Sequence, residues 1–153
     1  MDHFIEKALN LSPLDQIGLV VKDIEASIKL YDPLFGPFSM MEPDEMTYLY
    51  RGVEEPCKMR LAFGKTGNIE IELIELISGK SPHKEFLDAG REGIHHIRFI
   101  VDDLDKSVTA AKKLKFHPIW TRKFAEGLAV AYLERNNDPL LIEFFENHGT
   151  MPE

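Results

Sequence analysis

The sequence predicts an α+β fold built from two tandem βαβββ modules. Three observations support this prediction: the chain contains an internal repeat, each copy opens with a β-branched run followed by a helical segment, and three strand-like runs follow each helix. A length of 153 residues suits one compact domain, or two small modules that share one core. We expect a first module at 12–77, a linker with a short helix at 78–93 and a second module at 94–147.

The repeat is visible in two pairs of segments. LDQIGLVVKDIEASI and GIHHIRFIVDDLDKSV align at a constant offset of 80, so that Val21 matches Val101. IEIELIE and LLIEFFE align at an offset of 71, so that Glu72 matches Glu143. Because the offsets differ by nine, the first module has nine additional residues between its opening and closing strands. We expect them within 37–60, as loop and edge strand.

Local signals place the elements in order along the chain. Asp23 and Asp103 have the character of N-caps, and the segments that follow them carry apolar residues at i, i+4 and i+7. Gly36 is expected to close the first of these helices. Ser81 and Pro82 indicate the start of the linker helix. The β-branched and alternating runs predict strands at 14–21, 46–51, 59–64, 69–77, 94–101, 117–121, 127–134 and 139–146.

Composition excludes several classes of protein. A formal net charge of −8 argues against a nucleic-acid surface, and no apolar run approaches the roughly 20 residues of a membrane span. The first ten residues lack the apolar stretch of a signal peptide. A single cysteine, Cys57, cannot form an internal disulfide and is read as structural. We therefore expect a cytoplasmic protein with no nucleic-acid or membrane partner.

Alternation along the strands singles out four side chains. Gln16, Glu72, His96 and Glu143 lie off the helix-packed face at equivalent points of the two copies, and they converge if the sheets curl. One imidazole, two carboxylates and one amide oxygen form a donor set for a borderline or hard dication. Four protein ligands on a six-coordinate ion leave room for substrate. The alternative is that these strand side chains face solvent on a one-sided sheet.

The segments GIHHIRFIVDD, LDQIGLVVKDIEASIKLY and LLIEFFE resemble the vicinal-oxygen-chelate superfamily, which includes glyoxalase I, methylmalonyl-CoA epimerase, extradiol dioxygenases and bleomycin-resistance proteins. The resemblance covers about residues 12–147. It implies curled mixed sheets that form a cup around one divalent metal ion (Co, Ni, Mn or Zn). Carried over by position, the superfamily's metal ligands fall on Gln16, Glu72, His96 and Glu143.

Within the superfamily, SPHKEFLDAGREGIHHIRFIVDDLD most resembles methylmalonyl-CoA epimerase, with two departures. Gln16 stands where the epimerases usually have His, and a Gln, Glu, His, Glu set resembles one branch of glyoxalase I (lactoylglutathione lyase). The position of the epimerases' proposed base falls on Pro56, with Glu55 beside it. The glyoxalase interpretation has its own weakness, because the sequence carries no convincing glutathione-binding signature.

The resemblance implies a metal-dependent epimerase, isomerase or lyase that moves a proton next to a carbonyl through a metal-stabilised enolate. Glu143 is the expected base, Glu72 is the symmetric alternative and Glu55 is a candidate second acid. The expected partner is a small-molecule substrate, an acyl-CoA or a glutathione hemithioacetal, and no substrate-binding residue is predicted. The resemblance also implies a homodimer. A non-catalytic small-molecule-binding protein is the alternative from another class, whereas Gln16 disfavours an iron dioxygenase with a two-His, one-carboxylate site.

Overall fold

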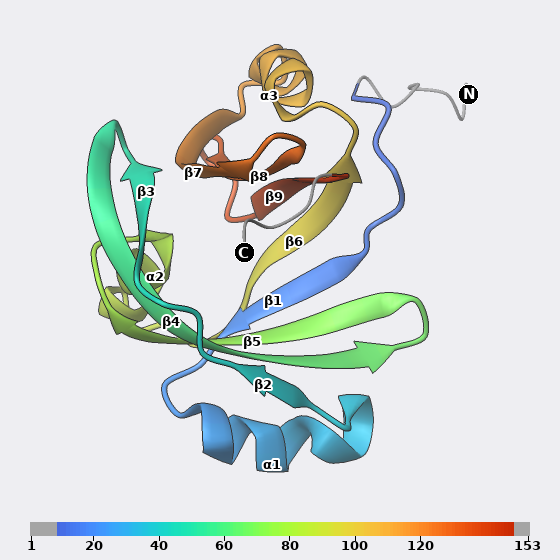
Figure 1. Cartoon of the computed structure of the whole chain (residues 1–153), viewed down its shortest axis with the longest axis vertical. Helices are drawn as coiled ribbons and strands as arrows, with labels where there is room; N and C mark the ends of the chain where they lie inside the picture. The colour runs from blue at the N-terminus through green and yellow to red at the C-terminus, as the bar shows by residue number, and fades with distance from the viewer. Residues whose placement is uncertain (1–8, 149–153) are drawn as a thin grey trace.

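The computed structural model describes residues 9–148 (Figure 1). Its helices are α1 (Ile24–Phe35), α2 (Pro82–Asp88) and α3 (Leu104–Lys112). None of these helices is both long and apolar enough to cross a membrane. The strands are β1 (Gln16–Val20), β2 (Ser39–Met41), β3 (Met46–Tyr50), β4 (Val53–Thr66), β5 (Ile69–Ser78), β6 (Gly93–Val101), β7 (His117–Ala125), β8 (Leu128–Glu134) and β9 (Leu141–Asn147).

The described strands form one curled sheet in the order β2-β4-β3-β7-β8-β9-β6-β1-β5, and a further pairing of β4 with β5 closes it. Eight strands therefore make a barrel-like cup, and β2 extends it beside β4. The pairs β1–β5 and β6–β9 are parallel, and β1 joins the two halves by pairing antiparallel with β6. The predicted α+β fold with a curled mixed sheet is confirmed.

Both repeat helices begin at two carboxylates. Asp23 and Asp103 cap α1 and α3 as predicted, and each accepts a 3.0 Å hydrogen bond from the backbone N–H three residues further on. In addition, Glu75 on β5 and Glu146 on β9 each accept a 2.7 Å hydrogen bond from the first N–H of the helix in their own half. Acceptors at the N-terminus satisfy donors that the helix itself cannot pair, so each closing strand is tied to its helix.

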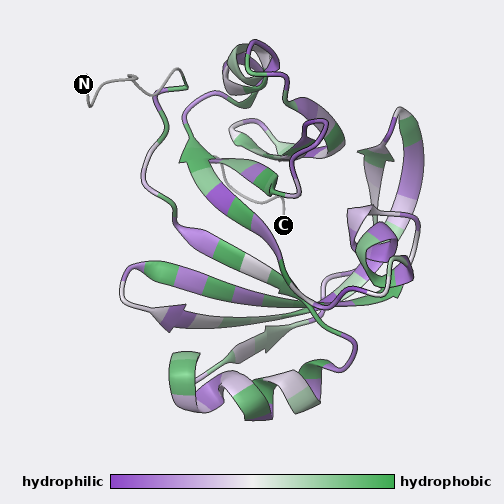
Figure 2. Cartoon of the chain, turned by 180° about the vertical axis from the view of Figure 1, so that it is seen from behind, coloured by the Kyte–Doolittle hydropathy of each residue, from purple (hydrophilic) through white to green (hydrophobic). Residues whose placement is uncertain are grey.

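Two of the four hydrophobic clusters lie outside the cup, between the sheet and the helices. Helix α1 packs on β4 and β5, and α3 packs on β7, β8 and β9 (Figures 1 and 2). The outward faces predicted from alternation are confirmed: Leu19 and Ile71 pack with Ile24 in one cluster, and Val101 packs with Phe144 in the other. Because these apolar residues alternate with the others along each strand, the opposite faces of the same strands point into the cup.

The additional length of the first half lies in the β2–β4 segment. Strand β2 is a short strand absent from the sequence-based assignment, and four residues separate it from β3. Strand β4 is longer than the predicted 59–64, because its first residues pair with β3 and its later residues pair with β5. Helix α2 starts at the Ser81 cap and Pro82 as predicted.

Candidate metal centre

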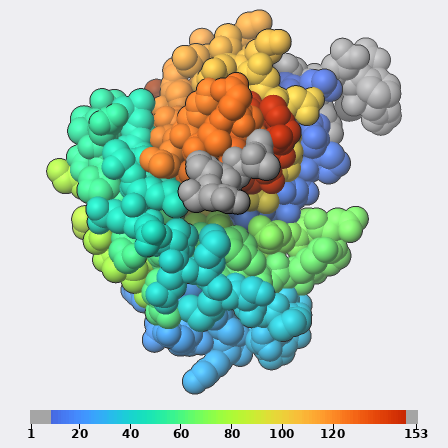
Figure 3. Space-filling view, in the orientation of Figure 1, coloured from blue at the N-terminus to red at the C-terminus, as the bar shows by residue number. Residues whose placement is uncertain are grey.

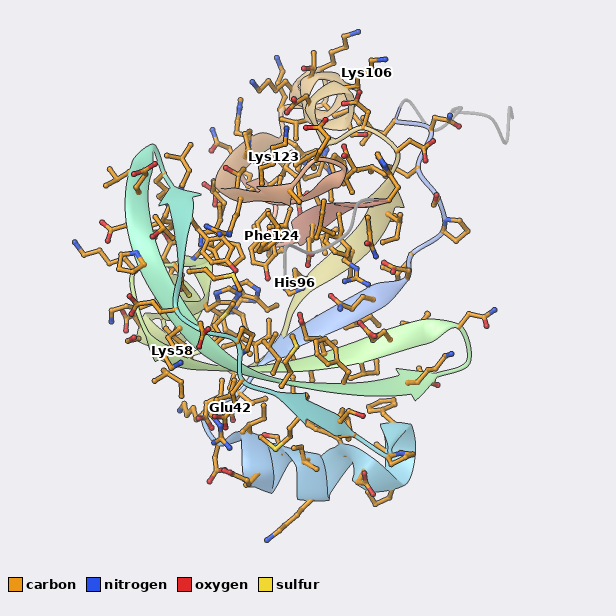
Figure 4. The ribbon with its side chains drawn as sticks, viewed as in Figure 1. Glu42, Lys58, His96, Lys106, Lys123 and Phe124 are labelled. Atoms are coloured by element: carbon orange, nitrogen blue, oxygen red, sulfur yellow. The ribbon has the colours of Figure 1, made fainter. Side chains whose placement is uncertain are left out.

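Strand register places the predicted ligands on the inner face of four neighbouring strands. On β1, Gln16 lies opposite Glu70 of β5 and Arg98 of β6, and Gly18 lies opposite Glu72 of β5 and His96 of β6. Strand β9 then pairs with β6, with Glu143 opposite Arg98. Strands β5, β1, β6 and β9 therefore place inward side chains in two adjacent rows across the sheet, one through Gln16 and one through Gly18. The interior position of His96 is visible in Figure 4, where Lys106 and Lys123 lie on the outside.

Glu72, His96 and Glu143 form a compact cluster. One donor atom from each lies within 4.8 Å of the others. The Nε2 atom of His96 is 3.0 Å from Oε1 of Glu143 and 3.7 Å from Oε1 of Glu72. His96 is fully buried, and Glu143 is 6% exposed. Glu143 comes from β9 and Glu72 from β5, the two strands that flank the central pair of β6 and β1.

The protonation of this cluster suits a cation. Burial lowers the pKa of His96 to about 3, so that its ring is neutral at physiological pH and its contacts with the carboxylates are not ion pairs. Burial also raises the pKa of the carboxyl groups of Glu72 and Glu143, and the charge of Glu143 raises that of Glu72 further. In the metal-free cluster, a neutral imidazole thus lies between two carboxyl groups that resist ionisation. A bound dication would favour their ionised form and lower their pKa values again.

Unpaired atoms support the same interpretation. His96 Nε2 is buried and has no hydrogen-bond partner, and neither has Oε1 of Gln16. The amide of Gln16 is oriented, because its Nε2 donates a 2.7 Å hydrogen bond to Glu70 Oε1. This leaves the carbonyl oxygen, the better metal ligand, unused. Five buried side-chain atoms of the described residues have no partner, and two of them belong to predicted ligands. The residues therefore fit a divalent ion with nitrogen and oxygen ligands.

A neighbouring histidine holds the ring of His96. Nδ1 of His95 is 3.0 Å from Nδ1 of His96, and both side chains are buried. A nitrogen that binds a metal must be unprotonated, and Nε2 is the ring nitrogen of His96 that faces the carboxylates, so for a metal ligand the proton of neutral His96 belongs on Nδ1. The Nδ1 atom of His95 is then an acceptor, and His96 donates to it. The lone pair of His96 is left on Nε2, which faces the carboxylates.

The cluster lies in a cavity of about 650 Å³. Strands β3 to β5 line one side, and strands β6 to β9 line the other. Figure 3 shows the face on which the cyan and green segments of the first half meet the orange and red segments of the second. Glu72 and Glu143 are on the lining, together with Tyr132, whose hydroxyl is 3.1 Å from Nε2 of buried His83. Burial raises the pKa of Tyr132 well above its ordinary value, so the hydroxyl stays protonated.

One predicted residue lies away from this centre. Glu55 pairs with Tyr48 in the β3–β4 ladder and is not on the described cavity lining, although Tyr48 is. Sequence reasoning missed other residues of the site: Tyr132, Trp120 and His83 carry no motif, and the only signal for Gly18 was its place between Gln16 and Val20 on the inward face.

The closed cup of paired β-strands thus carries a buried His and carboxylate cluster, a candidate metal site, beside a cavity. Residues 15–132 match the model of the glyoxalase/bleomycin resistance protein/dioxygenase superfamily. The chain belongs to this superfamily, as the sequence predicted.

The chain is also similar to two uncharacterized proteins, and its fold is similar to that of a solved structure. The chain is 28% identical over 142 residues to uncharacterized protein YqjC of Bacillus subtilis (strain 168), covering 91% of this chain and 95% of YqjC. It is 33% identical over 136 residues to uncharacterized protein YwbC of the same organism, covering 87% and 96%. The fold is similar to Streptomyces coelicolor methylmalonyl-CoA epimerase in complex with 2-nitronate-propionyl-CoA, with a TM-score of 0.67, 20% identity and coverage of 94% and 99%.

Proposed function

We propose that this protein is a metal-dependent enzyme that moves a proton on the carbon next to a carbonyl, the reaction class of methylmalonyl-CoA epimerase. The observation that carries the proposal is the convergence of Glu72, His96 and Glu143 on one point of the cavity, with the Nε2 lone pair of His96 unpaired. Gln16, Glu72, His96 and Glu143 would hold the ion. A dication in this position polarises a carbonyl oxygen and stabilises the negative charge that develops on it.

Glu143 is the proposed base. It lines the cavity beside His96, and its burial makes the carboxylate a stronger base than one in water. Glu72 faces the same space from the other side, so it replaces Glu55 as the proposed second acid. Tyr132 lies opposite Glu143 in the β8–β9 ladder and is part of the cavity wall, and its hydroxyl pairs with Nε2 of buried His83.

A glyoxalase I-type isomerase is the second candidate, because Gln16 is buried with an unpaired carbonyl oxygen at the first ligand position. The two reactions share the removal of a proton next to the carbonyl. They differ in where the proton returns: to the opposite face of the same carbon, or to the neighbouring carbon.

We also propose that the protein is a cytoplasmic homodimer. Light scattering on the purified protein tests the dimer.

The first experiment measures metal content. Purified protein is submitted to elemental analysis, and the stripped protein is titrated with Co²⁺, Ni²⁺, Mn²⁺ and Zn²⁺. We expect about one ion per chain, lost in His96→Ala and kept in His117→Ala, which removes an exposed histidine on β7. Assays of methylmalonyl-CoA epimerisation and of the hemithioacetal of methylglyoxal and glutathione then compare the two reactions. If none of the four ions binds, the enzyme proposal is wrong, and a non-catalytic binding protein takes its place.

A further inference from the structure

The walls of the cavity around the metal centre are largely apolar and aromatic. Tyr48 and Trp120 stack with ring centroids 3.8 Å apart and planes at 11°, and Trp120 is 4.7 Å from the ring of Tyr132. Phe124 meets Tyr48 edge to face. Aromatic walls of this kind bind flat apolar groups, since stacked and edge-on contacts add to the burial of area. The lining also includes Met41, Met46, Met59, Phe63 and Phe145.

The charges on the lining are acidic. Asp44, Glu70, Glu72 and Glu143 face the cavity, and Arg98 is the one basic side chain on the described lining. Arg98 is already paired: its Nε and Nη2 atoms lie 3.1 and 2.8 Å from the two carboxylate oxygens of Asp15. A dication balances two of the four carboxylates, so no positive charge is left over for an anionic group of the substrate.

Nearby basic side chains do not change this balance. Arg122 packs over the rings of Tyr48 and Phe124 and donates a 2.7 Å hydrogen bond to the carbonyl of Thr47, but it is not on the lining. Lys58 is also absent from the lining, and its Nζ is 3.4 Å from the carbonyl of Pro43. A substrate carboxylate that entered the cavity would lose its hydrating water and would lie near the negative charges of Glu70 and Asp44. No basic side chain on the lining is free to offset that cost in free energy.

From these observations we infer that the site takes an uncharged carbonyl compound with a flat apolar body, and that it rejects a free carboxylate or phosphate on the part that enters the cavity. The inference rests on the proposed function, because the metal centre anchors the oxygen end of the compound. A methylmalonyl group has a carboxylate at its reacting end. The inference therefore keeps the reaction class of the epimerases and assigns this chain a different substrate class.

The test compares three oxygen chelators on the Co²⁺-loaded protein: benzohydroxamate, 4-carboxybenzohydroxamate and acetohydroxamate. Trp120 reports binding, because it is the only tryptophan of the chain and lies on the cavity wall. We expect benzohydroxamate to bind at least tenfold more tightly than acetohydroxamate, which lacks the ring, and at least tenfold more tightly than the carboxylated ligand. Calorimetry repeats the measurement without relying on the reporter.

Charge variants identify the cause. Asp44→Asn and Glu70→Gln each remove a negative charge from the lining and should reduce the discrimination against the carboxylated ligand at least threefold. Glu54→Gln removes an exposed carboxylate that is not on the lining and should leave it unchanged. Equal binding of the two aromatic ligands, or equal binding of benzohydroxamate and acetohydroxamate, overturns the substrate class. Failure of the stripped wild-type protein to bind any of Co²⁺, Ni²⁺, Mn²⁺ and Zn²⁺ overturns the proposed function, and the inference with it.

Discussion

Gly18 lies directly beneath the imidazole of His96. The two residues are opposite each other in the β1–β6 ladder, and a β-carbon on Gly18 would overlap the ring. The ring fills the space that a side chain on β1 would occupy, and this close approach holds Nε2 between the two carboxylates. A glycine in a strand interior is unfavourable in itself, and here the approach of a functional ring explains it.

Gly18→Ala is expected to displace His96 and weaken Co²⁺ binding at least tenfold, measured by titration of the stripped protein. It is also expected to destabilise the protein by about 1–3 kcal/mol, as overpacking does. A double-mutant cycle with His96→Ala isolates the contact, because the clash disappears once the ring is gone. If Gly18→Ala costs as much stability in the His96→Ala background as in the wild type, the ring is not the cause.

His95→Phe is expected to weaken metal binding roughly 10- to 100-fold, because the acceptor that holds the Nδ1–H of His96 is lost. His95→Gln offers a carbonyl oxygen at a similar distance and should recover part of the affinity. The ¹⁵N shifts of His96 provide a second readout: the metal-free wild type should show the Nδ1–H form, and His95→Phe a mixture. Unchanged tautomer populations in both variants would contradict this role.

Stability of the metal-free protein should fall as pH rises from about 5 toward 8. Burial raises the pKa of Glu143 and Glu72 in the folded state, so the folded protein keeps protons that the unfolded chain has already lost. Stability is therefore present at low pH and declines as these carboxyls ionise. Glu143→Gln removes one of them, and at pH 8 it should be more stable than the wild type by about 1 kcal/mol, roughly 2–4 °C in Tm.

The comparison between variants separates this effect from other titrations. Burial holds His83 neutral, with a pKa well below its ordinary value, so that histidine favours stability at higher pH in both proteins and cancels in the difference. Glu54→Gln serves as the exposed control and should follow the wild type at every pH. The difference in unfolding free energy between Glu143→Gln and the wild type should grow between pH 5 and 8. If it does not, ionisation of Glu143 does not destabilise the folded protein.

Asp15→Asn should change ligand selectivity. Asp15 neutralises Arg98, the one basic side chain on the described lining, and the pair is partly buried. Without Asp15, the guanidinium keeps only the more distant Glu70, whose Oε1 is 3.7 Å from Nη2, and becomes more available to an anionic ligand. We expect the affinity of Co²⁺-loaded protein for 4-carboxybenzohydroxamate to rise at least threefold, with that for benzohydroxamate unchanged. Stability should fall by about 1–3 kcal/mol, because Arg98 loses the carboxylate that accepts two of its hydrogen bonds.

Much of the fold was predictable because it depends on local pattern. The offset between Val21 and Val101 revealed two modules, and Asp23 and Asp103 marked where their helices begin. Alternation assigned Leu19 and Phe144 to the outer cores. Strand β2 escaped prediction because three exposed residues carry no periodic signal, and its place is decided by pairing with β4.

The sequence by itself determined which residue types face inward. Side chains of a strand alternate between its two faces. The face taken by Gln16, Glu72, His96 and Glu143 therefore follows from the apolar residues beside them. Only the tertiary structure decided which inward residues meet. Alternation along a strand does not set the register between strands or the curvature of the sheet. The pairing of β4 with β5 and of β1 with β6 closed the cup. That closure brought Glu72 beside His96, left Glu55 off the cavity lining and added Tyr132 and Trp120 to the wall, because contacts between distant strands depend on how the sheet closes.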